Sequence, residues 1–153
     1  MEAVMKNVIR LLKDDHAFVK KLFRQYERAD KPADLPLRAD LFRQINDELT
    51  LHTRLEEEIV YPALEDLGTE VADAYHGDAH EDHEEVKRLL YDLNHVDPGS
   101  DRFDLDMKRV ILVVERHIEE EEEGILPYME RRLNQLKLDL LGEEIEERKH
   151  ALA

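Results

Sequence analysis

Residues 14–23 read DDHAFVKKLF, and a similar pattern returns at residues 81–90 as EDHEEVKRLL. A second pair of stretches also matches, HTRLEEEIVYP at residues 52–62 and HIEEEEEGILP at residues 117–127. The chain therefore contains, twice, a histidine followed by a His-x-x-x-Glu unit, at nearly equal offsets of 67 and 65 residues. Two similar helical hairpins that each donate two His and one Glu can enclose a pair of metal ions.

The composition indicates one acidic, cysteine-free domain. The 153 residues suffice for one core but are too few for two domains, so we expect a single domain over residues 1–153. The net charge of −16 argues against nucleic-acid partners, because no basic stripe is present. Without Cys, disulfides, zinc–thiolate sites and thiol nucleophiles are excluded.

Neither a membrane span nor a secretion signal is predicted. The longest apolar run covers only residues 110–114, whereas a membrane span needs about 20 residues. The N-terminus lacks the basic start and long apolar stretch of a signal peptide. We therefore expect a cytoplasmic protein without a membrane partner.

The spacing of apolar residues predicts an all-α fold without strands. The expected helices cover residues 3–29, 36–67, 70–94, 101–123 and about 136–150. Short loops make neighbouring helices antiparallel, so the first four should form an up-down-up-down bundle over about residues 3–134, with a short additional C-terminal helix. Pro62 and Pro127 are expected to kink or break the ends of the second and fourth helices.

The repeated histidines lie on the apolar faces of the expected helices. Each has apolar neighbours three, four or seven positions away, so all four should face the bundle core. They are His16, His52, His83 and His117.

Two glutamates should join the histidines in the core. Residues at i and i+4 share a helix face, which places Glu56 beside His52 and Glu121 beside His117. A core carboxylate is costly unless it is paired or coordinates a metal, and imidazole with carboxylate suits Fe, Mn or Zn. We therefore predict two divalent or trivalent cations bridged by the glutamates, with open positions for water, dioxygen or peroxide. The other acids of residues 56–58 and 119–123 are predicted to be solvent-exposed.

Other ring-bearing residues carry weaker predictions. A lone core histidine is usually only hydrogen-bonded, but the duplication of the whole set favours metal binding. His80 can supply an extra ligand, whereas His76 suits a role beside the site, in a channel or on the surface. His95 and His150 should be solvated. The sequence does not assign the tyrosines to packing or to the site.

These motifs resemble the hemerythrin-type HHE cation-binding domains, whose pattern is H…HxxxE…H…HxxxE on a four-helix bundle. The match covers about residues 5–130, including the proline ten residues after each HxxxE histidine. The resemblance implies a di-iron centre, which an oxo or hydroxo group can bridge. It implies that one iron takes His16 and His52, that the other takes His83 and His117, and that Glu56 and Glu121 bridge.

The chain departs from the oxygen-carrying hemerythrins in two positions. Those proteins have another histidine four residues before the third-helix ligand, where this chain has Ala79. They also use Asp as the second bridge, where this chain has Glu121. Reversible oxygen carriage is therefore not the expected function.

Three functional hypotheses follow. The first is a non-haem di-iron protein that binds or reacts with dioxygen, hydrogen peroxide or nitric oxide. The second is a module that senses or stores iron or oxygen without turnover, and the third is a purely structural or partner-binding bundle. Ferritin-like di-iron bundles fit less well, because their Glu-x-x-His pattern is carboxylate-rich and places the carboxylate first.

Overall fold

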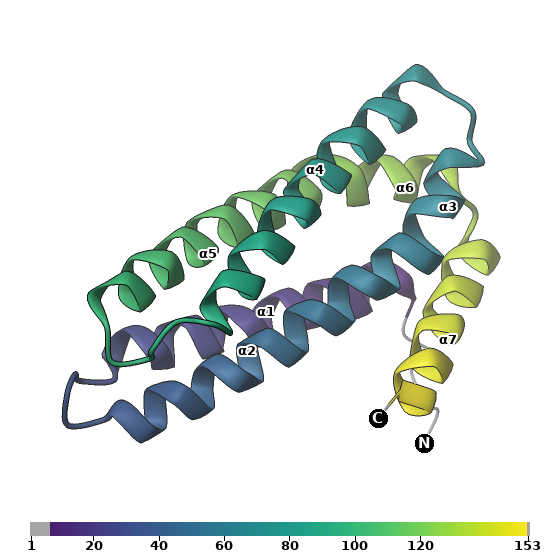
Figure 1. Ribbon diagram of the computed structural model, residues 1–153. Helices are drawn as coiled ribbons and strands as arrows, with labels where there is room; N and C mark the ends of the chain where they lie inside the picture. Colours follow the sequence, from purple (N-terminus) through teal and green to yellow (C-terminus); the bar gives the residue numbers. More distant parts are fainter. Residues whose placement is uncertain (1–6, 153) are drawn as a thin grey trace.

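The computed structural model describes residues 7–152. Four long antiparallel helical segments form an up-down-up-down bundle, and a fifth helix packs beside one end of it (Figure 1). The predicted all-α bundle with an additional C-terminal helix is confirmed. The first helix was expected from residue 3, and residues 3–6 lie outside the described part of the chain. In order, the elements are α1 (Val8–Arg28), α2 (Leu35–Leu55), η1 (Glu56–Val60), α3 (Tyr61–Glu65), α4 (Glu70–Leu93), α5 (Asp101–Glu120), η2 (Glu121–Ile125), α6 (Leu126–Arg132) and α7 (Gln135–Leu152).

Local signals fix where the long helices begin and where the first hairpin ends. Asn7, Thr69 and Ser100 are N-caps whose side chains accept a hydrogen bond from the backbone N–H three residues later. Gly68 follows α3 with φ at +66°, a left-handed conformation that favours glycine. These residues bring the second segment to an end and start α4 directly after it.

The prolines disturb the second and fourth segments, as expected, but each does so through a π-helical turn and neither breaks its segment. Proline lacks an N–H, and its ring clashes with the carbonyl four residues earlier in an α-helix. Before Pro62 the chain widens into the π-helix η1, in which the Tyr61 N–H bonds to the Glu56 carbonyl five residues back. Before Pro127 the π-helix η2 forms the same bond to the Glu121 carbonyl. The fourth segment therefore continues to Arg132 instead of ending near residue 123.

The bundle interior has two apolar clusters with a polar layer between them. One cluster joins the middle and far end of the bundle, including Phe23, Ile45 and Phe103. The other joins the start of α1, the two π-helices and their continuations, and α7. α7 packs mainly on α1, with further contacts to η1 and α2. Within residues 7–152, no helix is long and apolar enough to cross a membrane.

Candidate metal centre

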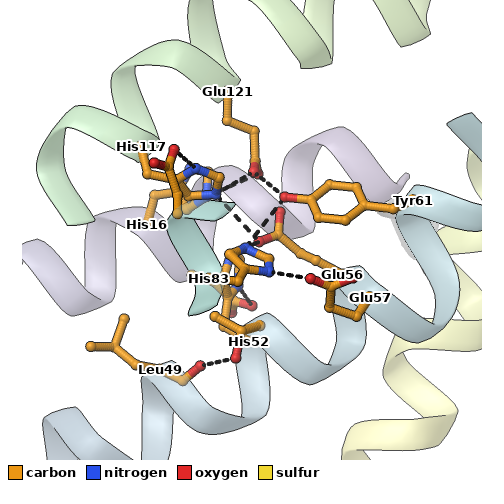
Figure 2. Close-up of polar contacts among 12 residues, drawn as sticks. His16, Leu49, His52, Glu56, Glu57, Tyr61, His83, His117 and Glu121 are labelled. Carbon is orange, nitrogen blue, oxygen red and sulfur yellow. Dashed lines mark hydrogen bonds and ion pairs between the residues drawn. The ribbon is translucent and has the colours of Figure 1, made fainter. Parts of the chain in front are cut away.

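The six predicted ligands lie between the two apolar clusters. Figure 2 shows them gathered around one point. All are buried, and the two glutamates have no exposed surface. The histidines form two pairs, one from each hairpin. The ring centroids of His16 and His52 are 5.1 Å apart, and those of His83 and His117 are 4.9 Å apart. The two hairpins thus contribute equally, as the sequence repeat predicts.

Each glutamate reaches histidines of both hairpins. Glu56 Oε1 lies 3.1 Å from His52 Nε2 in its own hairpin and 3.2 Å from His83 Nε2 in the other. Glu121 Oε2 lies 3.1 Å from His117 Nε2, and its Oε1 lies 3.3 Å from His16 Nε2. Both carboxylates therefore span the two histidine pairs, which is the arrangement that bridging between two cations requires.

Several of these inward-facing atoms have no hydrogen-bond partner. The buried unpartnered atoms of the layer are His16 Nε2, His52 Nε2, His117 Nε2, Glu56 Oε2 and Glu121 Oε1. Although the nitrogens lie close to the carboxylates, burying polar atoms without a hydrogen bond is costly. Ligand-type atoms of His16, His52, Glu56 and Glu121 also lie within 4.8 Å of one another, as do those of Glu56, His83 and His117. The donor set thus fits nitrogen- and oxygen-preferring cations such as iron.

The second ring nitrogen of each histidine, Nδ1, lies within hydrogen-bond distance of a carboxylate, and these four carboxylates form an outer ring around the cluster. The Nδ1 atoms of the four histidines each lie 2.7 to 3.1 Å from a carboxylate oxygen. Donating Nδ1–H to a carboxylate fixes the tautomer and leaves the Nε2 lone pair free for a metal. The partners, in the order His16, His52, His83 and His117, are Glu122, Asp15, Glu57 and Asp82.

The sequence reasoning missed this ring. Glu57 and Glu122 were expected to be solvent-exposed, but both are only partly exposed and bond to histidines, so that expectation was wrong. The signal was present in the repeat itself. Asp15 and Asp82 each precede a ligand-type histidine at the 67-residue offset, and each bridging-type glutamate is followed by a second Glu at the 65-residue offset.

Charge pairing decides the protonation of this cluster. Burial alone would lower the pKa of His52, but Glu56 and Asp15 outweigh it and hold that pKa well above 6.5. Burial would also lower the pKa of His117, but the carboxylates of Asp82 and Glu121 raise it well above 6.5. At Glu56, burial would raise the pKa, but the neighbouring imidazoles and Glu121 hold it well below 4.5. Without a cation, protons therefore compensate the carboxylates.

Tyr61 is a further candidate ligand, which the sequence could not assign. Its hydroxyl donates to Glu121 Oε2 at 3.0 Å and lies 3.4 Å from His83 Nε2, and its ring stacks on His83 (Figure 2). Burial and then the charges of Glu121 and Glu56 raise the pKa of this phenol well above 10. The residue at the 65-residue offset is Leu126, so Tyr61 makes the two halves of the site inequivalent.

The remaining histidines stand outside the cluster. His80 is half exposed and contacts Glu57 at 3.1 Å, so it supports the outer ring rather than the inner cluster. His76 pairs with Glu65 at 2.7 Å. His95 and His150 are exposed, as expected.

A small cavity of about 20 Å³ adjoins the four histidines, on the side that faces the apolar cluster of Phe23, Ile45 and Phe103. Its apolar wall comprises Val19, Leu49, Val86, Val114 and Ile118, and its remaining lining residues are Asp15, Glu48 and Thr53. This volume holds a water-sized group.

The family model of the Hemerythrin HHE cation binding domain matches residues 7–129. The chain belongs to this family. The sequence-based resemblance is therefore confirmed, and membership of a cation-binding family together with the buried His/Glu cluster supports metal binding. α7 lies beyond the matched residues.

The chain is similar to proteins of different lengths. The hemerythrin-type chain is 27% identical to a Hemerythrin HHE cation binding domain-containing protein from Mycobacterium kansasii, with a TM-score of 0.80 over 96% of this chain and 87% of that one. A DNA nickase of Nostoc sp. is 26% identical over 84% of this chain and 35% of its own length. An uncharacterized hemerythrin-like protein of Schizosaccharomyces pombe is 29% identical over 76% of this chain and 57% of its own length. This chain thus spans less than two thirds of either curated relative.

Proposed function

We propose that this hemerythrin-type chain binds two iron ions and uses them to bind or react with small oxidants. His16 and His52 would hold one ion, His83 and His117 the other, and Glu56 and Glu121 would bridge them. The observation that carries the proposal is the set of buried Nε2 and Oε atoms that face one another without a hydrogen bond. Bound iron supplies redox chemistry and exchangeable positions for ligands.

The protein's own residues prepare the site for that role. The outer carboxylates hold each Nδ1 proton and so direct each Nε2 inward. The apolar clusters on both sides limit bulk water. The cavity of about 20 Å³ beside the histidines favours small ligands over larger substrates.

Peroxide consumption by the iron-loaded protein tests the oxidant role. Wild-type protein should consume hydrogen peroxide, and His52→Ala should lose this activity together with part of the iron. His95→Ala is the matched control, since His95 is exposed and bonds only to the Tyr91 carbonyl within the described residues. A wild-type protein that holds two irons but leaves peroxide, dioxygen and nitric oxide unchanged would favour the alternative of an iron-storing module.

A further inference from the structure

The buried face of α7 ends in a lysine. Leu138, Leu141 and Ile145 recur at helical spacing and are buried in the apolar cluster that joins α1, the two π-helices and α7. Lys149 lies four residues after Ile145, so it continues the same face of the helix. Its ammonium reaches α1, where Nζ lies 2.6 Å from Asp15 Oδ1. Burial of the three apolar side chains thus brings Lys149 to Asp15.

Asp15 joins Lys149 to a residue of the candidate metal centre. One oxygen of Asp15 accepts from Lys149, and the other accepts from His52 Nδ1 at 3.1 Å. The side chains of Asp15 and Lys149 are 13% and 29% exposed, and charge-assisted hydrogen bonds are stronger where little water screens them. The contacts form a continuous chain from α7 through α1 to α2. The position of α7 therefore determines how firmly Asp15 holds His52.

The second hairpin holds its corresponding aspartate in a different way. Asp82, at the 67-residue offset from Asp15, accepts from His117 Nδ1 at 3.1 Å. Its cationic partner is Arg116 of α5, which lies at 3.4 Å and is 54% exposed. An ion pair to such an exposed side chain contributes little. The structure thus links the His16 and His52 half of the centre to α7, and it gives the other half a surface arginine instead.

We propose that Lys149 is a positioning residue for His52, and that docking of α7 and binding of a cation by the His16 and His52 pair strengthen each other. Lys149 holds Asp15, Asp15 holds the Nδ1–H of His52, and the orientation of that ring fixes where Nε2 points. A cation that binds better when α7 is docked must stabilise the docked helix by the same factor. The inference rests on the proposed metal binding, and it adds to that site a helix beyond the residues that the family model matches.

Three variants test this coupling. Lys149→Met removes the ammonium and keeps the apolar stem, Lys149→Arg keeps a charged donor, and exposed Lys137→Met on α7 is the matched control. The probe is redox-inert zinc(II), titrated calorimetrically into each protein. NMR of the zinc-loaded proteins follows the exchange of the histidine Nδ1–H protons with water. Hydrogen exchange of the backbone amides of residues 138–145, with and without zinc, reports the docking of α7.

The expected changes are confined to one half of the centre. In Lys149→Met, the Nδ1–H proton of His52 should exchange at least about tenfold faster, whereas that of His117 should keep its wild-type rate. One of the two zinc ions should bind about tenfold more weakly, because the hydrogen-bond partner of His52 is loosened. Zinc should slow amide exchange in α7 of the wild type, and about tenfold less so in Lys149→Met. Lys149→Arg should restore most of each property, and Lys137→Met should change none.

The contrary outcomes are distinct from one another. A wild-type exchange rate of the His52 proton, or wild-type affinity for both zinc ions, in Lys149→Met would overturn the positioning role of Lys149. Equal acceleration of the His52 and His117 protons would show that Lys149 only stabilises the fold, which also overturns that role. Wild-type protein that binds no zinc would instead overturn the proposed metal centre itself.

Discussion

Metal binding to this cluster should release protons, because His52 and His117 are protonated in the metal-free protein. Each ring lies between two carboxylates. His52 has Asp15 and Glu56 at 3.1 Å, and His117 has Asp82 and Glu121 at 3.1 Å. These contacts raise both pKa values well above 6.5. A cation must take the Nε2 lone pair, so it displaces one proton from each ring.

The size of the effect follows from linkage. Each proton displaced changes the apparent association constant about tenfold per pH unit, or about 1.4 kcal/mol. Two protons should therefore make the product of the two association constants about 100-fold larger at pH 7 than at pH 6. The product of the association constants should stop rising with pH once the pH passes the raised pKa values of His52 and His117.

The stability of the metal-free protein has a matching pH dependence. The raised pKa values of His52 and His117 stabilise the native state fully below about pH 6.5, and this contribution is lost as the pH rises through the raised values. The lowered pKa of Glu56 stabilises it above about pH 4.5, and that contribution is lost as the pH falls through the lowered value. The metal-free cluster should thus be best compensated between about pH 4.5 and 6.5.

Calorimetric titration with redox-inert zinc(II) at pH 7, in two buffers of different ionisation enthalpy, measures the proton release. We expect at least two protons per chain for the wild type. Asp15→Asn and Asp82→Asn each remove one carboxylate that raises a histidine pKa, so each should release fewer protons. Zinc binding without proton release at pH 7 would refute the assigned protonation of His52 and His117.

Four further outcomes are expected. Iron at 100 times its dissociation constant should add about 2.7 kcal/mol to the free energy of unfolding, which raises the melting temperature by about 5 to 10 °C. Equal melting temperatures of the metal-free and iron-loaded protein would count against metal in the core. Glu122→Gln should weaken iron binding about 10- to 100-fold in a chelator competition, because it loosens the His16 ring, and an unchanged affinity would argue against the outer ring. Ala79→His, one turn before His83, should slow peroxide consumption and favour a stable oxygen adduct, whereas unchanged kinetics would show that position 79 has no access to the site. His80→Ala should leave the iron content unchanged, since half-exposed His80 contacts Glu57 of the outer ring and the His76 ring, and a loss of one iron would make it a ligand.

Periodicity and repetition were sufficient to predict the bundle and the six clustered residues. The helical spacing of apolar residues specifies the four long segments, and the duplicated HxxxE places histidine and glutamate on one core face. The π-helices were not predictable by the same reasoning. A proline inside a helix indicates a disturbance, but whether the chain kinks, stops or widens depends on packing around Pro62 and Pro127.

The outer carboxylates and Tyr61 show a second limit of the sequence. A Glu in an acidic run looks solvated, and only the neighbouring hairpin reveals that Glu57 reaches His83 and that Glu122 reaches His16. These contacts join residues 26 and 106 positions apart in the chain. Tyr61 directly follows the π-helix η1, and it contacts His83 of the other hairpin, which the sequence alone does not place beside it.

Anomalous X-ray diffraction at the iron absorption edge, on crystals of the iron-loaded protein, tests the central claim most directly. We expect two anomalous peaks in the polar layer, one beside His16 and His52 and the other beside His83 and His117, with both glutamates between them. One peak, no peak, or peaks at surface carboxylates away from these histidines would contradict the two-iron centre.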